Sequence, residues 1–170
     1  HIPLNVVDGV GDVMGCIRDD DMPVRAGARD SILNAGPGES TYLDYDARIA
    51  EHAEAWLRDA ATRDDDKPWV LFVSFVCPHP PFVAPPDLYD YYHRADLPAP
   101  VQHAPRDRPD HPVLSHFRRI FQHDEPYTPH ELRAVTAAYY GTSEYLDQQV
   151  GKVVDALTAN GLGDGTRVLY

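Results

Sequence analysis

One short segment limits the folds that this chain of 170 residues can adopt. Residues 69–76 (WVLFVSFV) are apolar at odd and even positions alike, with a single serine among them. A run of this length, rich in β-branched and aromatic residues, is typical of a strand buried on both faces in a parallel sheet. Three prolines follow within five residues, and proline cannot continue a central ladder. We therefore predict a central strand that ends abruptly at residue 77.

Two helical patterns flank this strand. Apolar residues recur every three or four positions between 44 and 63, which predicts an amphipathic helix with a narrow, alanine-rich buried face. A longer helix is predicted to begin at Thr128, where Glu131 completes a capping box and Pro129 occupies the first turn, and to stop at Gly161. Residues 166–170 begin another strand. This order of elements predicts an α/β sandwich with a largely parallel central sheet flanked by helices.

The remaining segments have weaker patterns. Residues 1–41 are predicted to be irregular with at most short elements, residues 86–92 to form one or two helical turns, and residues 114–121 to form a short helix. The connection over residues 84–127 is long and rich in proline, histidine and aspartate. A connection of this length is usually a lid, a binding loop or an insertion, so we expect it to line a pocket.

The charge of the chain argues against two classes of partner. Fifteen Lys and Arg against 27 Asp and Glu give a net charge of −12, which repels nucleic acid and anionic lipid. The longest apolar run, residues 69–77, is far shorter than the ~20 residues of a membrane span. We expect no nucleic-acid partner and no membrane span, whereas the two cysteines leave the compartment open and nothing fixes the oligomeric state.

His79 is the candidate catalytic residue. It lies just beyond the carboxyl end of the predicted central strand, where open α/β sheets place their ligand crevices. Pro78, Pro80 and Pro81 restrict the backbone around it, so the imidazole is held in one direction and can donate a proton or bind an anion. The alternative from these facts alone is a loop histidine that only caps carbonyl groups.

Three stretches together resemble the middle of a sulfatase of the alkaline-phosphatase-like superfamily. They are residues 67–82 (KPWVLFVSFVCPHPPF), residues 96–100 (DLPAP) and residues 138–157, and residues 166–170 resemble the strand that precedes a Thr/Ser-Asp-His-Gly segment in that family. The resemblance covers residues 44–170. It implies that residues 1–170 are an internal fragment, the central part of a single catalytic domain, with residues 84–127 as a pocket or specificity loop.

The resemblance also implies an activity. Sulfatases hydrolyse sulfate monoesters of small molecules or carbohydrates with a formylglycine nucleophile and a divalent metal, here expected to be calcium. In this family a histidine in the turn after the strand contacts the sulfate and helps the leaving oxygen depart, which assigns that role to His79.

The nucleophile and the metal ligands are expected outside this chain. Neither Cys16 nor Cys77 is followed by the x-Pro/Ala-x-Arg sequence that formylglycine formation needs in this family. The early Asp-Asp ligands and the late Asp-His-Gly are also absent, and the acidic run of residues 19–21 follows no strand and is expected to be solvated. The chain alone is therefore expected to be inactive, with no cofactor-binding or metal-binding residue of its own.

Other candidate residues have simpler explanations. Five histidines have no compact zinc spacing and are expected to be loop residues, some of them lining the pocket: His103, His111, His116, His123 and His130. Three tyrosines are expected to pack in the second helix: Tyr139, Tyr140 and Tyr145. Asp8 and Asp12 are expected in turns, and Lys67 at the start of the strand.

Two alternative functions stay open at this point. A phosphonate monoester or phosphodiester hydrolase of the same superfamily would use the same core. A non-catalytic, acidic and His-rich binding domain would keep the fold without the nucleophile, and tight binding of zinc or calcium by the chain itself would favour it.

Overall fold

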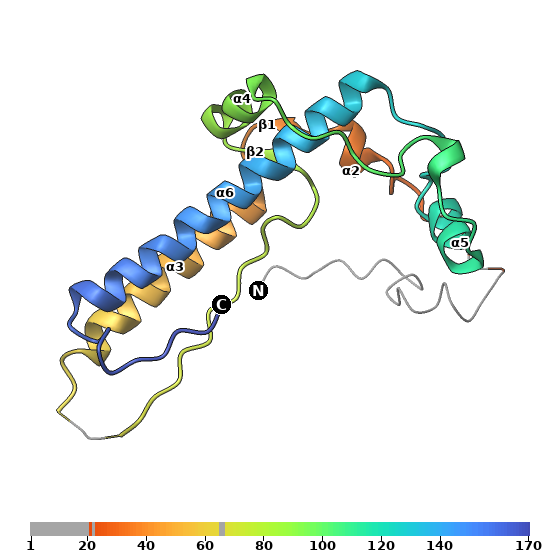
Figure 1. Ribbon diagram of the computed structural model, residues 1–170. Coiled ribbons are helices and arrows are strands. Elements are labelled where there is room, and N and C mark those ends of the chain that lie inside the picture. Colours follow the sequence, from red (N-terminus) through yellow and green to blue (C-terminus); the bar gives the residue numbers. More distant parts are fainter. Residues whose placement is uncertain (1–20, 22, 65–66) are drawn as a thin grey trace.

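A computed structural model describes residues 21, 23–64 and 67–170, and it consists mainly of helices (Figure 1). The earlier residues 1–20, which include Asp8, Asp12, Cys16, Asp19 and Asp20, lie outside the described part of the chain. In chain order the elements are α2 (Asp30–Leu33), β1 (Gly36–Pro37), α3 (Thr41–Ala60), β2 (Val83–Ala84), α4 (Pro86–Arg94), η1 (Pro105–Asp107), α5 (Pro112–Ile120) and α6 (Pro129–Ala159).

Two long helices, α3 and α6, pack side by side and run in the same direction (Figure 1). Ser40 caps α3 by accepting the Leu43 N–H, and the Thr128–Glu131 capping box starts α6. Both predicted helices are confirmed, although α3 begins and ends three residues before the predicted limits. The buried face of α3 has the predicted spacing of three and four and contains one charged residue: Leu43, Asp46, Ala50, Ala53, Leu57 and Ala60.

The sheet of the described residues has two short parallel strands, β1 and β2, paired in the register Gly36 with Val83 and Pro37 with Ala84. It lies against α6 at Gly141, where an added Cβ would stand 2.8 Å from the Cβ of Ala84. A side chain at position 141 would therefore push β2 away from the helix. The helix α4 follows directly and packs on α6.

The strands predicted at residues 69–76 and 166–170 are not confirmed in the described part of the chain, where both segments are extended but have no ladder. A strand needs a neighbour to receive its N–H and C=O groups, and none of the described segments lies beside them in that way. The side chains nevertheless alternate as in a strand: 69, 71, 73 and 75 are half-buried, while 70, 72 and 74 are exposed. The sandwich with a central parallel sheet is thus absent from the described residues.

The segment 84–127 has defined structure of its own. It contains α4, as predicted for residues 86–92, and α5, which lies close to the short helix predicted at residues 114–121. The guanidinium of Arg29 lies 3.9 Å from the ring centre of Tyr127 and donates to the carbonyls of residues 122, 125 and 126. Arg108 donates to the carbonyls of His103 and Asp124. These two arginines fix the end of the segment.

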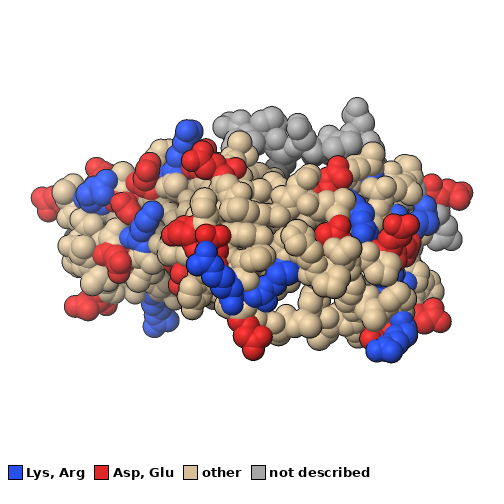
Figure 2. Space-filling model, turned by 90° about the horizontal axis from the view of Figure 1, so that it is seen from above, with Lys and Arg blue, Asp and Glu red and all other residues tan. Residues whose placement is uncertain are grey.

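Charged side chains of both signs are interspersed on the face of the molecule seen in Figure 2. Among the helices of residues 21, 23–64 and 67–170, none has both the length and the apolar character that crossing a bilayer requires.

Candidate functional site

The turn over residues 77–82 is attached to the fold on both sides. On the near side, the carboxylate of Asp46 in α3 accepts the N–H of Val76 at 2.8 Å and that of Cys77 at 2.9 Å. On the far side, the Phe82 carbonyl accepts the Gly36 N–H at 3.0 Å, next to the β1–β2 pair. The turn is therefore positioned by helix α3 at its start and by the small sheet at its end.

His79 projects from this turn and is exposed. Its Nδ1 lies 2.6 Å from the Pro80 carbonyl oxygen. A carbonyl oxygen can only accept, so Nδ1 carries the hydrogen of this bond, and Nε2 remains for another partner. The Tyr42 ring of α3 meets the imidazole edge to face, with ring centres 5.9 Å apart. The bond to Pro80 is the carbonyl contact expected of a simple loop histidine, but it occupies only one of the two ring nitrogens.

The Cys77 thiol is free, buried and not poised to react. Burial and the neighbouring carboxylate of Asp46 raise its pKa to about 12. The thiol therefore stays protonated at neutral pH, and the thiolate is the nucleophilic form of cysteine.

The five histidines of the loop and helix regions do not gather into a site. His103 accepts the Tyr127 N–H through Nε2 at 3.1 Å, and the His123 Nδ1 lies 2.6 Å from the Tyr127 hydroxyl. Burial and the charge of Arg29 lower the pKa of His123, which favours the neutral ring. The other three are spread along the chain at α5 and α6: His111, His116 and His130.

Metal-binding geometry is not found among the described residues, which contain no group of three or more His, Cys, Asp or Glu side chains able to hold a metal ion. Asp21 belongs to the acidic run of residues 19–21 and is exposed. Lys67 is exposed at the start of the extended segment, as expected.

The tyrosines of α6 take part in packing. Tyr145 donates its hydroxyl to the Leu43 carbonyl at 2.7 Å and so ties α6 to α3. Tyr139 packs its ring against Phe82 and Tyr140. Their contacts agree with the packing role expected from the sequence.

Asp46 is the residue of this site that sequence reasoning missed. The predicted buried face of the helix passed through Ala50, Ala53 and Leu57, and Asp46 lies four positions before Ala50, on the same face. A charged residue on the apolar face of an amphipathic helix was the available signal, because buried carboxylates need hydrogen-bond donors.

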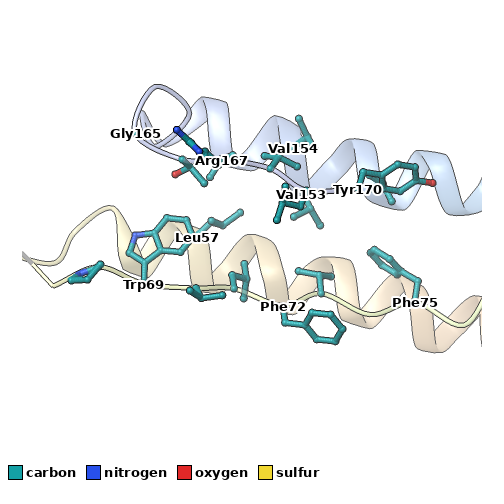
Figure 3. Close-up of a pocket in the computed structure, with 18 of the residues that line it drawn as sticks. Leu57, Trp69, Phe72, Phe75, Val153, Val154, Gly165, Arg167 and Tyr170 are labelled. Atoms are coloured by element: carbon teal, nitrogen blue, oxygen red, sulfur yellow. The ribbon is translucent and has the colours of Figure 1, made fainter.

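An apolar groove of about 880 Å³ lies between the two extended segments. Figure 3 shows residues 67–75 on one side of it and residues 165–170 on the other, over Leu57 of α3 and over Val153 and Val154 of α6. Both segments run back along the helices in the same direction (Figure 1). This is the arrangement of parallel strands whose connecting helices cover one face.

Comparisons with known proteins agree on one family. The family model described as Sulfatase matches residues 17–170. A choline-sulfatase of Rhizobium meliloti (strain 1021) is 32% identical over 149 residues, covering 82% of this chain and 28% of that protein. An arylsulfatase of Clostridium perfringens (strain 13 / Type A) is 32% identical over 108 residues, covering 64% of this chain and 22% of that protein. The multifunctional alkaline phosphatase superfamily protein PehA of Trinickia caryophylli is 30% identical over 121 residues, covering 62% of this chain and 23% of that protein. The chain spans about a quarter of the length of these relatives.

Proposed function

This chain belongs to the sulfatase family, and from that premise we propose that it is part of a hydrolase that cleaves sulfate monoesters, with His79 contacting the sulfate and the leaving oxygen. The family implies an alkaline-phosphatase-like α/β fold, and the chain itself is mixed, mainly helical with a small two-stranded parallel sheet. The substrate would be a small-molecule or carbohydrate sulfate ester, since the named relatives include a choline-sulfatase and an arylsulfatase.

The observation that carries the role of His79 is its hydrogen bond to the Pro80 carbonyl. This bond holds Nδ1 as a donor at 2.6 Å and fixes the plane of the ring. In the protonated imidazole, Nε2 then carries the proton that a departing alkoxide or phenoxide needs. Because the turn is attached to α3 and to β1, the ring does not need to be ordered when the substrate binds.

The complete protein is proposed to contain the α/β sandwich with a largely parallel central sheet. Residues 69–76 and 166–170 would be two of its strands, with α3 and α6 covering one face. In support of this, the two segments run in the same direction, their residues line one apolar groove, and Val70 and Phe72 are exposed apolar side chains. Residues 84–127 are proposed to form a pocket or specificity loop of this same domain.

The described residues do not fit a metal site, and no cysteine or serine among them is followed by the x-Pro/Ala-x-Arg sequence that formylglycine formation needs in this family. We therefore assign neither the divalent metal, expected to be calcium, nor the formylglycine to the described residues, and propose that both belong to other parts of the complete protein. The described residues would contribute to the reaction by holding His79 in place.

The test is the His79→Ala variant of the complete enzyme with phenyl sulfate, an aryl sulfate whose poor leaving group needs a general acid. Loss of general acid catalysis lowers kcat by about 10²- to 10⁴-fold. His130→Ala is the matched control, since this histidine is exposed at the start of α6, and its rate should equal the wild-type rate. An undiminished rate in His79→Ala would remove this residue from the mechanism.

A phosphonate monoester or phosphodiester hydrolase is the second candidate, and the similarity to PehA favours it. The two candidates differ in the group that is transferred and share the proposed role of His79. The ratio of kcat/KM for 4-nitrophenyl sulfate to that for 4-nitrophenyl phenylphosphonate decides between them in the complete enzyme. A preference for the phosphonate would replace sulfate ester hydrolysis as the main activity.

A further inference from the structure

We propose that Asp46 is a positioning residue for His79: its carboxylate fixes the end of the segment 69–76 and so sets the direction of the imidazole. The proposal rests on the proposed function of His79. Asp46 does not contact the imidazole, so its effect would pass through the backbone of residues 76–79.

The path from the carboxylate to the ring is short. Asp46 has no exposed surface, and it uses one oxygen for the Val76 N–H and the other for the Cys77 N–H. The carbonyl of Val76 in turn accepts the N–H of His79 at 3.0 Å. Val76 is therefore held through its N–H by Asp46 and holds His79 through its C=O.

The burial of a carboxylate at this position needs a reason, because removing a charge from water is costly. Among the ion pairs of the described residues none includes Asp46, and its hydrogen-bond donors are the backbone N–H groups of Val76 and Cys77 together with the Cys77 thiol. An apolar side chain would leave the N–H groups of Val76 and Cys77 without an acceptor where the strand ends. The two carboxylate oxygens therefore provide one acceptor for each of the two successive N–H groups that face α3 at the end of the extended segment.

Helix α3 contacts the turn at a second point, one helical turn earlier. Tyr42 lies four residues before Asp46 and packs its ring edge to face with His79. One face of α3 thus fixes both the backbone that leads to His79 and one side of its ring. A displacement of the chain end at Val76 would move the imidazole relative to Tyr42 as well.

The experiment compares the Asp46→Asn variant of the complete enzyme with wild type on two substrates. Phenyl sulfate has a poor leaving group and 4-nitrophenyl sulfate a good one, so a general acid matters more for phenyl sulfate. We expect the ratio of kcat/KM for 4-nitrophenyl sulfate to that for phenyl sulfate to rise about tenfold, mainly through kcat. This ratio does not depend on the fraction of folded enzyme, so a merely structural role would leave it unchanged.

Three further variants, and a fourth as a substitute for Asp46→Asn, make the result decisive. His79→Ala should raise the same ratio, and the double variant Asp46→Asn/His79→Ala should raise it no further than His79→Ala does. Asp44→Asn changes an exposed carboxylate of the same helix and should leave the ratio at its wild-type value. If Asp46→Asn yields no soluble enzyme, the same ratio is measured for Asp46→Glu. This variant displaces the carboxylate by one methylene and should also raise the ratio.

The outcomes separate the two proposals. A ratio that rises in His79→Ala but stays at the wild-type value in the Asp46 variant overturns the positioning role alone. Independent, multiplying effects in the double variant overturn it too. Unchanged rates on both substrates in His79→Ala overturn the proposed role of His79 itself.

Discussion

Apolar side chains have opposite exposures in two regions of the molecule. They are buried in the helix pair of α3 and α6 and exposed along one side of the extended segment of residues 69–76 beside it. Leu57 of α3 is 1% exposed, whereas Val70 is 93% and Phe72 is 88% exposed. Helices satisfy their own backbone hydrogen bonds and need only one apolar face covered, so α3 and α6 can pack as a pair. A buried strand needs neighbours along both edges and cover on both faces. The comparison shows that the helix pair covers its own apolar side chains, whereas the groove between residues 67–75 and 165–170 is exposed to solvent.

The largest effect on stability is expected from a charge introduced at an exposed apolar position of residues 69–76. The proposed central sheet of the complete protein would bury position 70, so Val70→Asp should prevent folding, because a buried carboxylate without a partner costs several kcal/mol against a total stability of about 5–15 kcal/mol. Val101 is 88% exposed and lies in the loop region, away from the groove, so Val101→Asp is the matched control. The yield of soluble protein and its circular dichroism measure both. Equal folding of the two variants would mean that the face of Val70 is open to water in the complete protein.

A smaller effect is expected within the closed helix pair. Leu57→Ala should lower the free energy of unfolding by about 2–5 kcal/mol, because it removes buried methyl groups and leaves a cavity. Leu114 is 44% exposed on α5, and Leu114→Ala should cost far less. Denaturant unfolding of the complete protein compares the two. A similar decrease in the free energy of unfolding for both variants would contradict the close packing of α3 on α6.

The smallest effect concerns the hydrogen bond between the helices. Tyr145→Phe removes the donor to the Leu43 carbonyl and should cost about 1 kcal/mol at neutral pH. Burial, followed by the negative charges around it, raises the pKa of Tyr145 from 10.0 to about 12. The hydroxyl is thus harder to ionise in the folded protein, so its contribution is complete below pH 10.0 and is lost as the pH rises to about 12.

The difference in stability between wild type and Tyr145→Phe should therefore shrink over this alkaline range. Other tyrosines titrate in both proteins, and their contributions cancel in the comparison. Denaturant midpoints at pH 8 and at several alkaline values measure it. A constant difference would show that Tyr145 does not ionise differently in the two states.

The position of His79 relative to the extended segment was predictable because apolar residues and prolines mark the end of that segment directly in the sequence. The capping box of α6 was predictable for the same reason, since its residues are three positions apart. The bond of Asp46 to Val76 was not, because it joins residues thirty positions apart. The contact of Gly141 with Ala84 likewise depends on how β2 meets α6.

The sequence by itself determined the local features: the helical periods of α3 and α6, the abrupt end of the apolar run of residues 69–76, and the turn that carries His79. Each depends on neighbours within about one or two helical turns, and such interactions act in any folded context. Only the tertiary structure decided that Asp46 is buried under the turn and that the two extended segments face each other across a groove. These features depend on where separate elements meet in space, because a hydrogen bond between distant residues leaves no periodic pattern along the chain.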